Sequence, residues 1–208
     1  QRIASDFFAG DPFRAYPALV VNALMRSNPF MVYAGQEYGE RGMDQEGFSG
    51  RDGRTTIFDY WTVPSLYRAH VSHSLTDDEK ALASLYDKVL NIAATEKAVG
   101  EGDFFDLMYV NPQSQSFNPR CHYAFLRKKD KEVIIVVVNF SEEANHVGVT
   151  IPGHAFDYFK MPERDVEAVD LLTDERTTFN LKKDGVVEMD LPPYSGRIFK
   201  FSIQMEDK

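Results

Sequence analysis

Cysteine is nearly absent from this sequence, and its absence excludes several classes of protein. The single residue, Cys121, cannot close an intrachain disulfide, and no group of cysteines and histidines has zinc-site spacing. Long apolar runs are missing too, because no segment approaches the roughly 20 residues of a membrane-spanning helix. No signal peptide is visible, and the sequence opens on Gln1, so we expect an end made by processing or truncation. We therefore expect no membrane partner.

Basic clusters are also scarce. The chain carries 23 lysines and arginines against 32 acidic residues, which gives a net charge of −9. The nearest basic cluster is Arg127-Lys128-Lys129, which Asp130 interrupts at once, and we interpret it as a solvated turn. An acidic chain without a basic patch is a poor candidate for binding a phosphate backbone, so the sequence predicts no nucleic-acid partner.

Hydrophobic and aromatic residues, by contrast, are plentiful, at 43% and 13% of the chain. They suffice for a packed core, and an aromatic excess also suits a surface that stacks on flat ligands. The 208 residues are enough for one large or two small domains. Because the pattern changes near residue 103, we predict two units. Residues 1–103 are expected to be helical with one apolar strand, and residues 104–208 to be all-β.

Three helical segments are expected in the first unit. Asp11 and Pro12 are typical of a helix start, with an aspartate cap and a proline in the first position. A short helix is expected from Pro64 to Val71. A longer helix, 77–98, follows a capping box formed by Thr76 and Glu79.

The apolar run from Phe30 to Ala34 breaks abruptly into Gly35-Gln36-Glu37. We interpret the run as a strand covered on both faces, as in a parallel sheet beneath helices. Residues 35–63 then form a long loop with glycines at 35, 39, 42, 47, 50 and 53. Loops of this length are usually functional or disordered, and the aromatic residues of this one argue against disorder.

Short β-like runs dominate the second unit. They predict strands at 106–110, 122–127, 133–140, 146–151, 166–170, 177–181, 186–191 and 196–201. Eight short strands separated by regular turns indicate an antiparallel sandwich of the Greek-key type. Lys183-Asp184-Gly185 lies between two of these strands and predicts a hairpin over 180–188.

The stretches PFMVYAGQEYGERG (29–42) and GFSGRDGRTTIFDYW (47–61) resemble the last barrel strand and the following loop of the α-amylase family of glycoside hydrolases, family 13. The all-β tail, closing on LPPYSGRIFKF (191–201), is similar to the C-terminal sandwich of that family. The resemblance implies an α+β fragment: a helical, one-strand remnant of a (β/α)8 barrel, then the sandwich. Its implied substrate is an α-glucan or maltooligosaccharide.

The resemblance also implies that the catalytic carboxylates belong to earlier barrel strands, which this sequence does not contain. Because a retaining glycosidase needs two carboxyl groups about 5–5.5 Å apart, we expect the chain alone to be inactive, with no catalytic residue of its own. Its implied partner is the missing N-terminal barrel portion. Two alternatives stay open: part of a glucanotransferase or maltosyltransferase of the same family, and a non-catalytic glucan-binding or barrel-stabilising module.

Seven residues are candidates for contacting substrate or supporting the cleft. They are Arg2, Gln36, Glu37, Tyr38, Arg54, Tyr60 and Trp61. Gln36 suits a sugar hydroxyl or a loop brace, and Glu37 suits a supporting acid or an ion pair with arginine. Arg54 suits several hydroxyls or an ion pair. The three aromatic residues suit stacking on glucose or the core, and Arg2 is expected to lean toward the missing cleft.

We expect no metal and no cofactor. His70 and His73 share one helical face, but no carboxylate completes a ligand set. Asp44 and Glu46 lack the later acceptors of a calcium loop, and Ser49, Ser195 and Cys121 lack the signature of an activated nucleophile. Without the rest of a barrel, the apolar faces of 13–34 and 82–92 are expected to be exposed, which predicts self-association through these helices.

Overall fold

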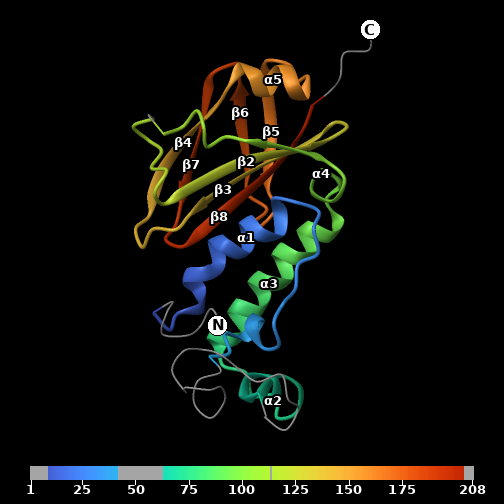
Figure 1. Cartoon of the computed structure of the whole chain (residues 1–208), viewed down its shortest axis with the longest axis vertical. Helices are drawn as coiled ribbons and strands as arrows, with labels where there is room; N and C mark the ends of the chain where they lie inside the picture. The colour runs from blue at the N-terminus through green and yellow to red at the C-terminus, as the bar shows by residue number, and fades with distance from the viewer. Residues whose placement is uncertain (1–8, 42–62, 113, 204–208) are drawn as a thin grey trace. The chain divides into compact units, whose positions relative to one another are not determined.

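The structure is a computed structural model that describes residues 9–41, 63–112 and 114–203. Its residues fall into two compact units. We call residues 9–19, 29–41 and 63–88 the helical unit, and residues 20–28, 89–112 and 114–203 the sandwich unit. Figure 1 shows the helices and strands of both. The predicted boundary at residue 103 stays a prediction. No helix of the described residues is long and apolar enough to cross a membrane.

Short helices make up the described part of the helical unit, together with parts of two longer ones. Its elements are η2 (Pro12–Ala15), the start of α1 (Tyr16–Leu24), η3 (Gln36–Tyr38), α2 (Pro64–His70) and most of α3 (Asp77–Thr95). The predicted start at Asp11 is confirmed, because the Phe13 N–H donates to Asp11 Oδ1 at 2.9 Å. The first turn is 3-10, and the α-helix begins only at Tyr16.

The capping box at the start of α3 is also confirmed. The Thr76 N–H donates to Glu79 Oε2 at 2.8 Å, and the Glu79 N–H donates to Thr76 Oγ1 at 3.2 Å. Each side chain thus satisfies a backbone donor that the helix itself leaves without a partner.

The predicted strand at Phe30–Ala34 is wrong. Residues 29–33 have no regular secondary structure, and Met31 is 81% exposed. A strand buried on both faces needs neighbouring strands to satisfy its backbone and layers to cover its side chains. Among the described residues, no strand pairs with this run. The α+β class is confirmed, without the one barrel strand that was expected.

The sandwich unit contains all the strands of the described chain, together with α4 (Lys97–Gly100) and α5 (Gly153–Phe159). The strands are β1 (Asp103–Asp106), β2 (His122–Lys129), β3 (Glu132–Asn139), β4 (Asn145–Ile151), β5 (Arg164–Asp170), β6 (Arg176–Leu181), β7 (Gly185–Leu191) and β8 (Ser195–Ser202). The last seven overlap their predicted ranges. The first, β1, shares only Asp106 with the run predicted at 106–110, and α5 was not predicted.

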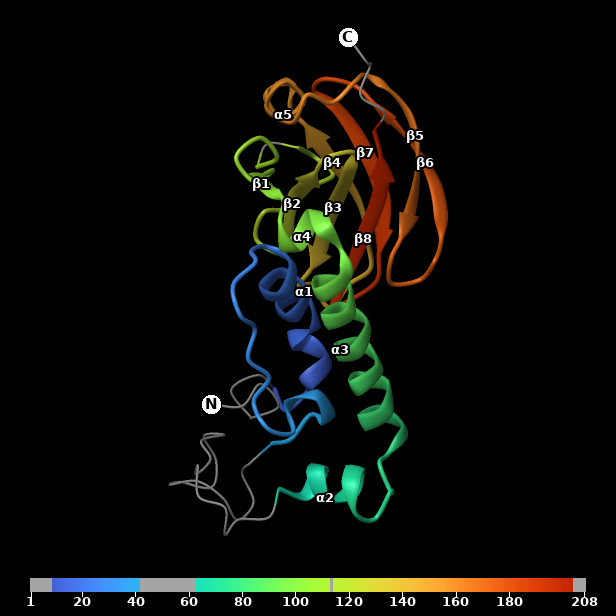
Figure 2. The ribbon, with the colours of Figure 1, turned by 90° about the vertical axis from the view of Figure 1, so that its right-hand side faces the viewer.

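The strands form two antiparallel sheets, one in the order β1-β2-β3-β8-β5-β6 and one in the order β4-β7 (Figure 2). Pairs β3–β8, β4–β7 and β5–β6 are nested along the chain, which is an order of the Greek-key type. The predicted 180–188 hairpin is wrong: β6 and β7 enter different sheets, and the turn at Asp184 (φ 58°) links the layers.

Side chains from both sheets meet in one core. Val133, Ile135 and Val137 of β3 pack in the same cluster as Val147 and Val149 of β4, and all five are fully buried. The alternate residues of β3 are buried on the opposite face of the sheet. There, a Cβ added at Gly196 would lie 3.1 Å from Val138 and 3.5 Å from Val20 of α1, so glycine allows α1 to approach the sheet.

Arg127 is buried, and this corrects its interpretation as part of a solvated turn. Its guanidinium donates four hydrogen bonds to backbone carbonyls: Ala98 O at 3.1 Å, Val99 O at 2.6 Å, Gly102 O at 2.8 Å and Met25 O at 2.7 Å. Carbonyls at helix C-terminal ends lack partners within the helix, and a cation complements their dipole. Arg127 therefore fastens the ends of α1 and α4 to the sheet.

The helix faces that were expected to be exposed are buried within a single chain. On α1 and α3, the buried residues are Tyr16, Leu19, Val20, Ala23 and Leu24, and Leu82, Tyr86, Val89 and Ile92. The expected exposure is therefore wrong for these two helices. Self-association itself stays a prediction without that basis.

Candidate functional site

The turn after the apolar run requires its glycines. Gly35 and Gly39 flank η3 and have φ values of 81° and 73°, a left-handed backbone that residues with side chains rarely adopt. A Cβ at Gly35 would lie 2.7 Å from Ser65 Oγ, and one at Gly39 would lie 2.9 Å from Pro12. Left-handed backbone and close neighbours together fix glycine at both positions. We call residues 35–40 the glycine turn.

Gln36 and Glu37 both lie near Tyr86, a buried residue of α3. The Gln36 side-chain amide donates to Tyr86 Oη at 2.9 Å. Burial raises the pKa of Tyr86, and the negative charge of Glu37 raises it further, against the hydrogen bond from Gln36. Gln36 thus ties the turn to α3 and has the position of a brace.

Glu37 is half-buried, and its Oε2 atom is shielded from water with no hydrogen bond from any described residue. A shielded carboxylate oxygen is costly unless a donor reaches it. Within the described part of the chain, Glu37 is therefore the carboxylate of the turn that has acceptor capacity left.

Tyr38 and Glu40 face α2. The Tyr38 ring packs edge-on against His70, with ring centroids 6.3 Å apart. The Ser65 N–H donates to Glu40 Oε2 at 3.0 Å, so a carboxylate distant in sequence caps the N-terminus of α2. The structure thus brings Gln36, Glu37 and Tyr38 into one turn. The other candidates, Arg2, Arg54, Tyr60 and Trp61, lie outside the described residues, as do Asp44, Glu46 and Ser49.

Sequence reasoning missed Tyr86 and Glu40 as parts of this site. Tyr86 occupies a position in the apolar stripe of α3, so its pattern indicated only core packing. Its hydroxyl is tied to a residue 50 positions away, a separation that no local pattern reveals. Glu40 was overlooked because, in the sequence, it is one of several charged residues in a polar loop.

No activated nucleophile or metal cluster appears among the described residues. Burial raises the pKa of the Cys121 thiol, which disfavours the thiolate. Ser195 Oγ donates to Pro192 O at 2.7 Å, away from any base. Within the described ranges, no group of three histidine, cysteine or acidic side chains could hold a metal ion. The buried Asp170 is used structurally, accepting from Arg197 at 2.8 Å and from the Leu172 N–H at 3.1 Å.

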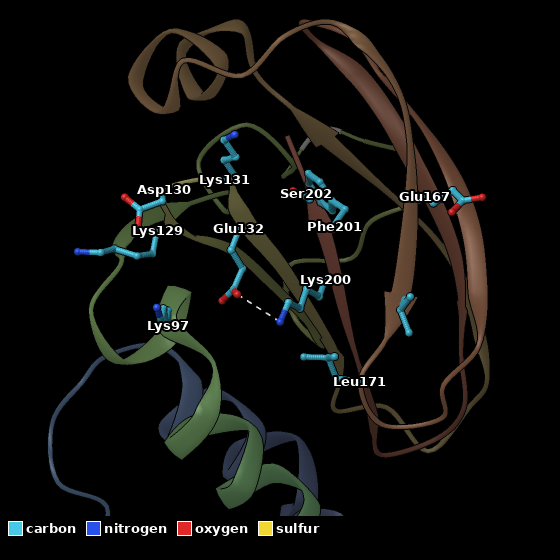
Figure 3. Close-up of a pocket in the computed structure, with 11 residues that line it drawn as sticks. Lys97, Lys129, Asp130, Lys131, Glu132, Glu167, Leu171, Lys200, Phe201 and Ser202 are labelled. Carbon is cyan, nitrogen blue, oxygen red and sulfur yellow. Dashed lines mark ion pairs between the residues drawn. The ribbon is translucent and has the colours of Figure 1, made fainter. Parts of the chain in front are cut away.

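A groove of about 700 Å³ opens on the sandwich unit (Figure 3). Its residues are Lys97, Lys129, Asp130, Lys131, Glu132, Glu167, Val169, Leu171, Lys200, Phe201 and Ser202. Glu132 accepts from the Ala98 N–H at 2.8 Å and pairs with Lys200 at 3.2 Å. The one aromatic ring of the groove, Phe201, is buried. Glu132 is thus already engaged, and none of the residues that line the groove offers an exposed ring for stacking on a sugar.

Comparison with known proteins rests on the fold. No protein-family model and no curated protein sequence matches the chain. Among solved structures, AmyP in complex with maltose aligns with a TM-score of 0.62 and 17% identity, over 96% of this chain and 36% of that one. The noncanonic maltogenic α-amylase AmyB from Thermotoga neapolitana aligns with a TM-score of 0.61 and 14% identity, over 92% and 37%. A debranching enzyme from Nostoc punctiforme aligns with a TM-score of 0.56 and 16% identity, over 95% and 33%.

These alignments cover nearly the whole chain but only about a third of each solved chain. The matched part is the C-terminal region of the α-amylase structures. The chain therefore has the fold of that region.

Proposed function

We propose that this chain is the C-terminal part of a retaining glycoside hydrolase of the α-amylase type. The whole enzyme would cleave α-1,4 or α-1,6 glucosidic bonds of glucans and transfer the released glucosyl group to water or to a sugar. The observation that carries the proposal is the fold match to amylase structures over 96% of the chain. The resemblance of residues 29–61 to the last barrel strand and loop of that family supports it independently. In this proposal, the catalytic carboxylates come from a preceding barrel portion, so the chain alone is inactive.

The glycine turn then contributes one wall of the substrate cleft. Loops after the strands of a barrel build its active site, and this turn follows the run that resembles the last strand. Gln36 is the brace that holds the wall to α3. Glu37 supplies a shielded acceptor for a donor of the barrel portion. Tyr38, together with Arg2, Arg54, Tyr60 and Trp61, is proposed to line or support the same cleft.

The native gene product tests the proposal, because its mass and its activity are separate readouts. We expect a mass above the 23.7 kDa of this sequence and release of reducing sugar from starch or maltooligosaccharides. The pure 208-residue chain should release none. A native product of 23.7 kDa, or activity of the isolated chain, would overturn the proposal that a preceding barrel portion supplies the catalytic carboxylates.

The role of Glu37 has its own test in the native product. In the proposal Glu37 supports the cleft without taking part in bond cleavage. Glu37→Gln should therefore lower kcat by about tenfold to a hundredfold, the size of effect expected from a small misplacement of reacting groups. Complete loss of activity with an unchanged fold would make Glu37 a catalytic residue and contradict the role proposed here.

A second candidate is a non-catalytic glucan-binding module. The specific observation in its favour is that the sandwich unit has a core of its own, drawn from both sheets. Under this alternative the native product binds starch saturably and hydrolyses nothing. The activity measurement above separates the two proposals directly.

A further inference from the structure

Two exposed tyrosines of the sandwich unit gather around one phenylalanine. Tyr109 and Tyr158 are 55% and 53% exposed. Their ring centroids lie 6.2 and 5.9 Å from that of Phe105, which is itself buried. His154, also exposed, packs edge-on against the same ring at 5.6 Å. We call Phe105, Tyr109, His154 and Tyr158 the aromatic platform.

The platform is held by a rigid scaffold. Phe105 belongs to β1, which is paired along its length with β2, and it also packs against Phe159 of α5 at 5.9 Å. Figure 2 shows β1 and α5 on the same side of the sandwich. Exposed aromatic side chains that gather in one place can form a binding surface. Here their backbone supports are fixed, so the rings are presented in a set arrangement.

Asn111 fixes the loop that carries Tyr109. This buried side chain donates to Leu107 O at 2.8 Å and to Thr150 O at 3.2 Å, and its Oδ1 accepts from the Thr150 N–H at 2.9 Å. Both the NH2 group and the oxygen of the Asn111 side chain therefore hold residues 107–111 against β4. A preorganised site binds with a smaller loss of conformational entropy than a flexible one.

The chemistry of the platform suits a neutral, amphipathic ligand. Each tyrosine offers an apolar face and a hydroxyl that can donate and accept. The two carboxylates next to platform residues in the chain are engaged: Asp106 accepts from the Met108 N–H at 3.0 Å, and Asp157 pairs with Lys183 at 2.6 Å. Engaged charges offer little to an ionic ligand. A pyranose ring, with an apolar C–H face and a rim of hydroxyls, matches both properties.

We propose that the aromatic platform binds an α-glucan chain, with pyranose rings stacked on Tyr109 and Tyr158. The choice of an α-glucan rests on the proposed function, whereas the preference for a neutral sugar rests on the platform itself. The sandwich unit thereby has a glucan contact of its own, built without any residue of the glycine turn.

Affinity electrophoresis of the full 208-residue chain through gels containing amylopectin tests the proposal. We expect the chain to be retarded, and the double variant Tyr109→Ala/Tyr158→Ala to weaken its apparent affinity by at least roughly tenfold, since two stacking rings are lost. Both residues are exposed, so folding should be preserved, and circular dichroism checks this. Tyr67→Ala is the matched control, since Tyr67 is 51% exposed but belongs to the helical unit.

A second double variant, Tyr109→Phe/Tyr158→Phe, keeps the rings and removes only the hydroxyls. It should retain most of the retardation if stacking dominates. Equal loss in the alanine and phenylalanine variants would overturn stacking as the mode of binding. An unretarded wild-type chain, or equal retardation of wild type and the alanine variant, would overturn the site.

Two further outcomes separate this inference from the proposed function. Retardation by barley β-glucan and not by amylopectin would overturn the α-glucan assignment, whatever the activity of the native product. Dimers in sedimentation that the alanine variant abolishes, without retardation in either gel, would make the platform a contact between two copies and overturn the inference. Retardation by amylopectin alongside an inactive native product would sustain the platform and refute the proposed hydrolase.

Discussion

Two continuous apolar runs in this chain have opposite fates. Residues 133–138 of β3 are fully buried, between β2 on one side and β8 on the other. The run Phe30–Ala34 is also continuously apolar, but it forms no strand and leaves Met31 81% exposed. A strand obtains its hydrogen bonds from its neighbours, and among the described residues the run Phe30–Ala34 has no pairing strand.

The two units also differ in how they satisfy buried polar groups. In the sandwich unit, buried polar side chains form hydrogen bonds with the backbone or with a charged partner, as Arg127, Asn111 and Asp170 do. In the helical unit, Glu37 Oε2 and Ser65 Oγ are buried without a hydrogen bond from any described residue. Buried polar atoms without partners are rare in folded proteins. Among the described residues, the helical unit therefore has buried polar atoms without a hydrogen-bond partner, whereas the three polar side chains named in the sandwich unit have partners.

The largest effect that distinguishes the units should come from removing a buried arginine. Arg127→Ala leaves four carbonyl groups at the ends of α1 and α4 without their donor. Each buried group left without a partner costs about 1–3 kcal/mol, partly offset where water enters. We expect the free energy of unfolding to fall by about 4 kcal/mol, measured by urea denaturation followed by circular dichroism.

Arg68→Ala in the helical unit is the matched control. Its side chain is 38% exposed and pairs with Glu79, so solvent screens the interaction. We expect a loss of about 1 kcal/mol or less. Equal losses for the two arginines would contradict the contrast drawn between the units.

The next largest difference in the free energy of unfolding should come from making the same substitution in each of the two apolar runs. Val137→Ala removes two methyl groups from the core of the sandwich, where the side chain is fully buried, and should cost about 2.5 kcal/mol. Val32→Ala, in the half-buried run, should change the free energy of unfolding by less than about 0.5 kcal/mol. Denaturant titrations of both variants measure the difference. A large loss at Val32 would mean that the run is packed as tightly as a core strand.

Much of the sandwich was predictable because its signals are local. Alternating apolar residues and regular turns located seven of the eight strands, since side-chain period and turn chemistry act over a few residues. The strand expected at 106–110 was misplaced, because the Asn111 side chain donates to Leu107 O and holds the residues between them in a loop. The 180–188 hairpin failed for a different reason: which sheet β7 joins depends on β4, far away in sequence.

The candidate site was predictable only in part. The glycines of the turn and the grouping of Gln36, Glu37 and Tyr38 followed from adjacency in the chain. Their partners did not, since Tyr86 and His70 lie on helices that come much later in the sequence. The aromatic platform was missed entirely, because Tyr109 and Tyr158 are 49 positions apart and only the fold brings them to Phe105.

The smallest expected effect is on stability in acid. It tests whether the Glu79 carboxylate stabilises the helical unit. The hydrogen bond from Arg68 is the main cause that lowers the pKa of Glu79, and the Thr76 backbone N–H lowers it further, against burial. A lowered folded-state pKa means that this stabilisation is fully present above the unfolded value of about 4.3 and is lost as pH falls through the folded value. Glu79→Gln should therefore cost about 1 kcal/mol at pH 7 and nothing at pH 2.

Asp77→Asn is the control for this substitution, because Asp77 pairs with Lys80 in full contact with solvent, and an exposed pair contributes little to the free energy of unfolding. The anchor of the sandwich unit differs in kind: the Arg127 guanidinium stays charged at every pH of interest, and backbone carbonyls do not titrate. Acid should thus weaken the cap of α3 without weakening the Arg127 anchor. Hydrogen exchange at pH 3 would show amides of α3 within residues 77–88 losing protection while those of β3 keep theirs. Parallel loss in both elements would show that the two units unfold as one and would remove the distinction between them.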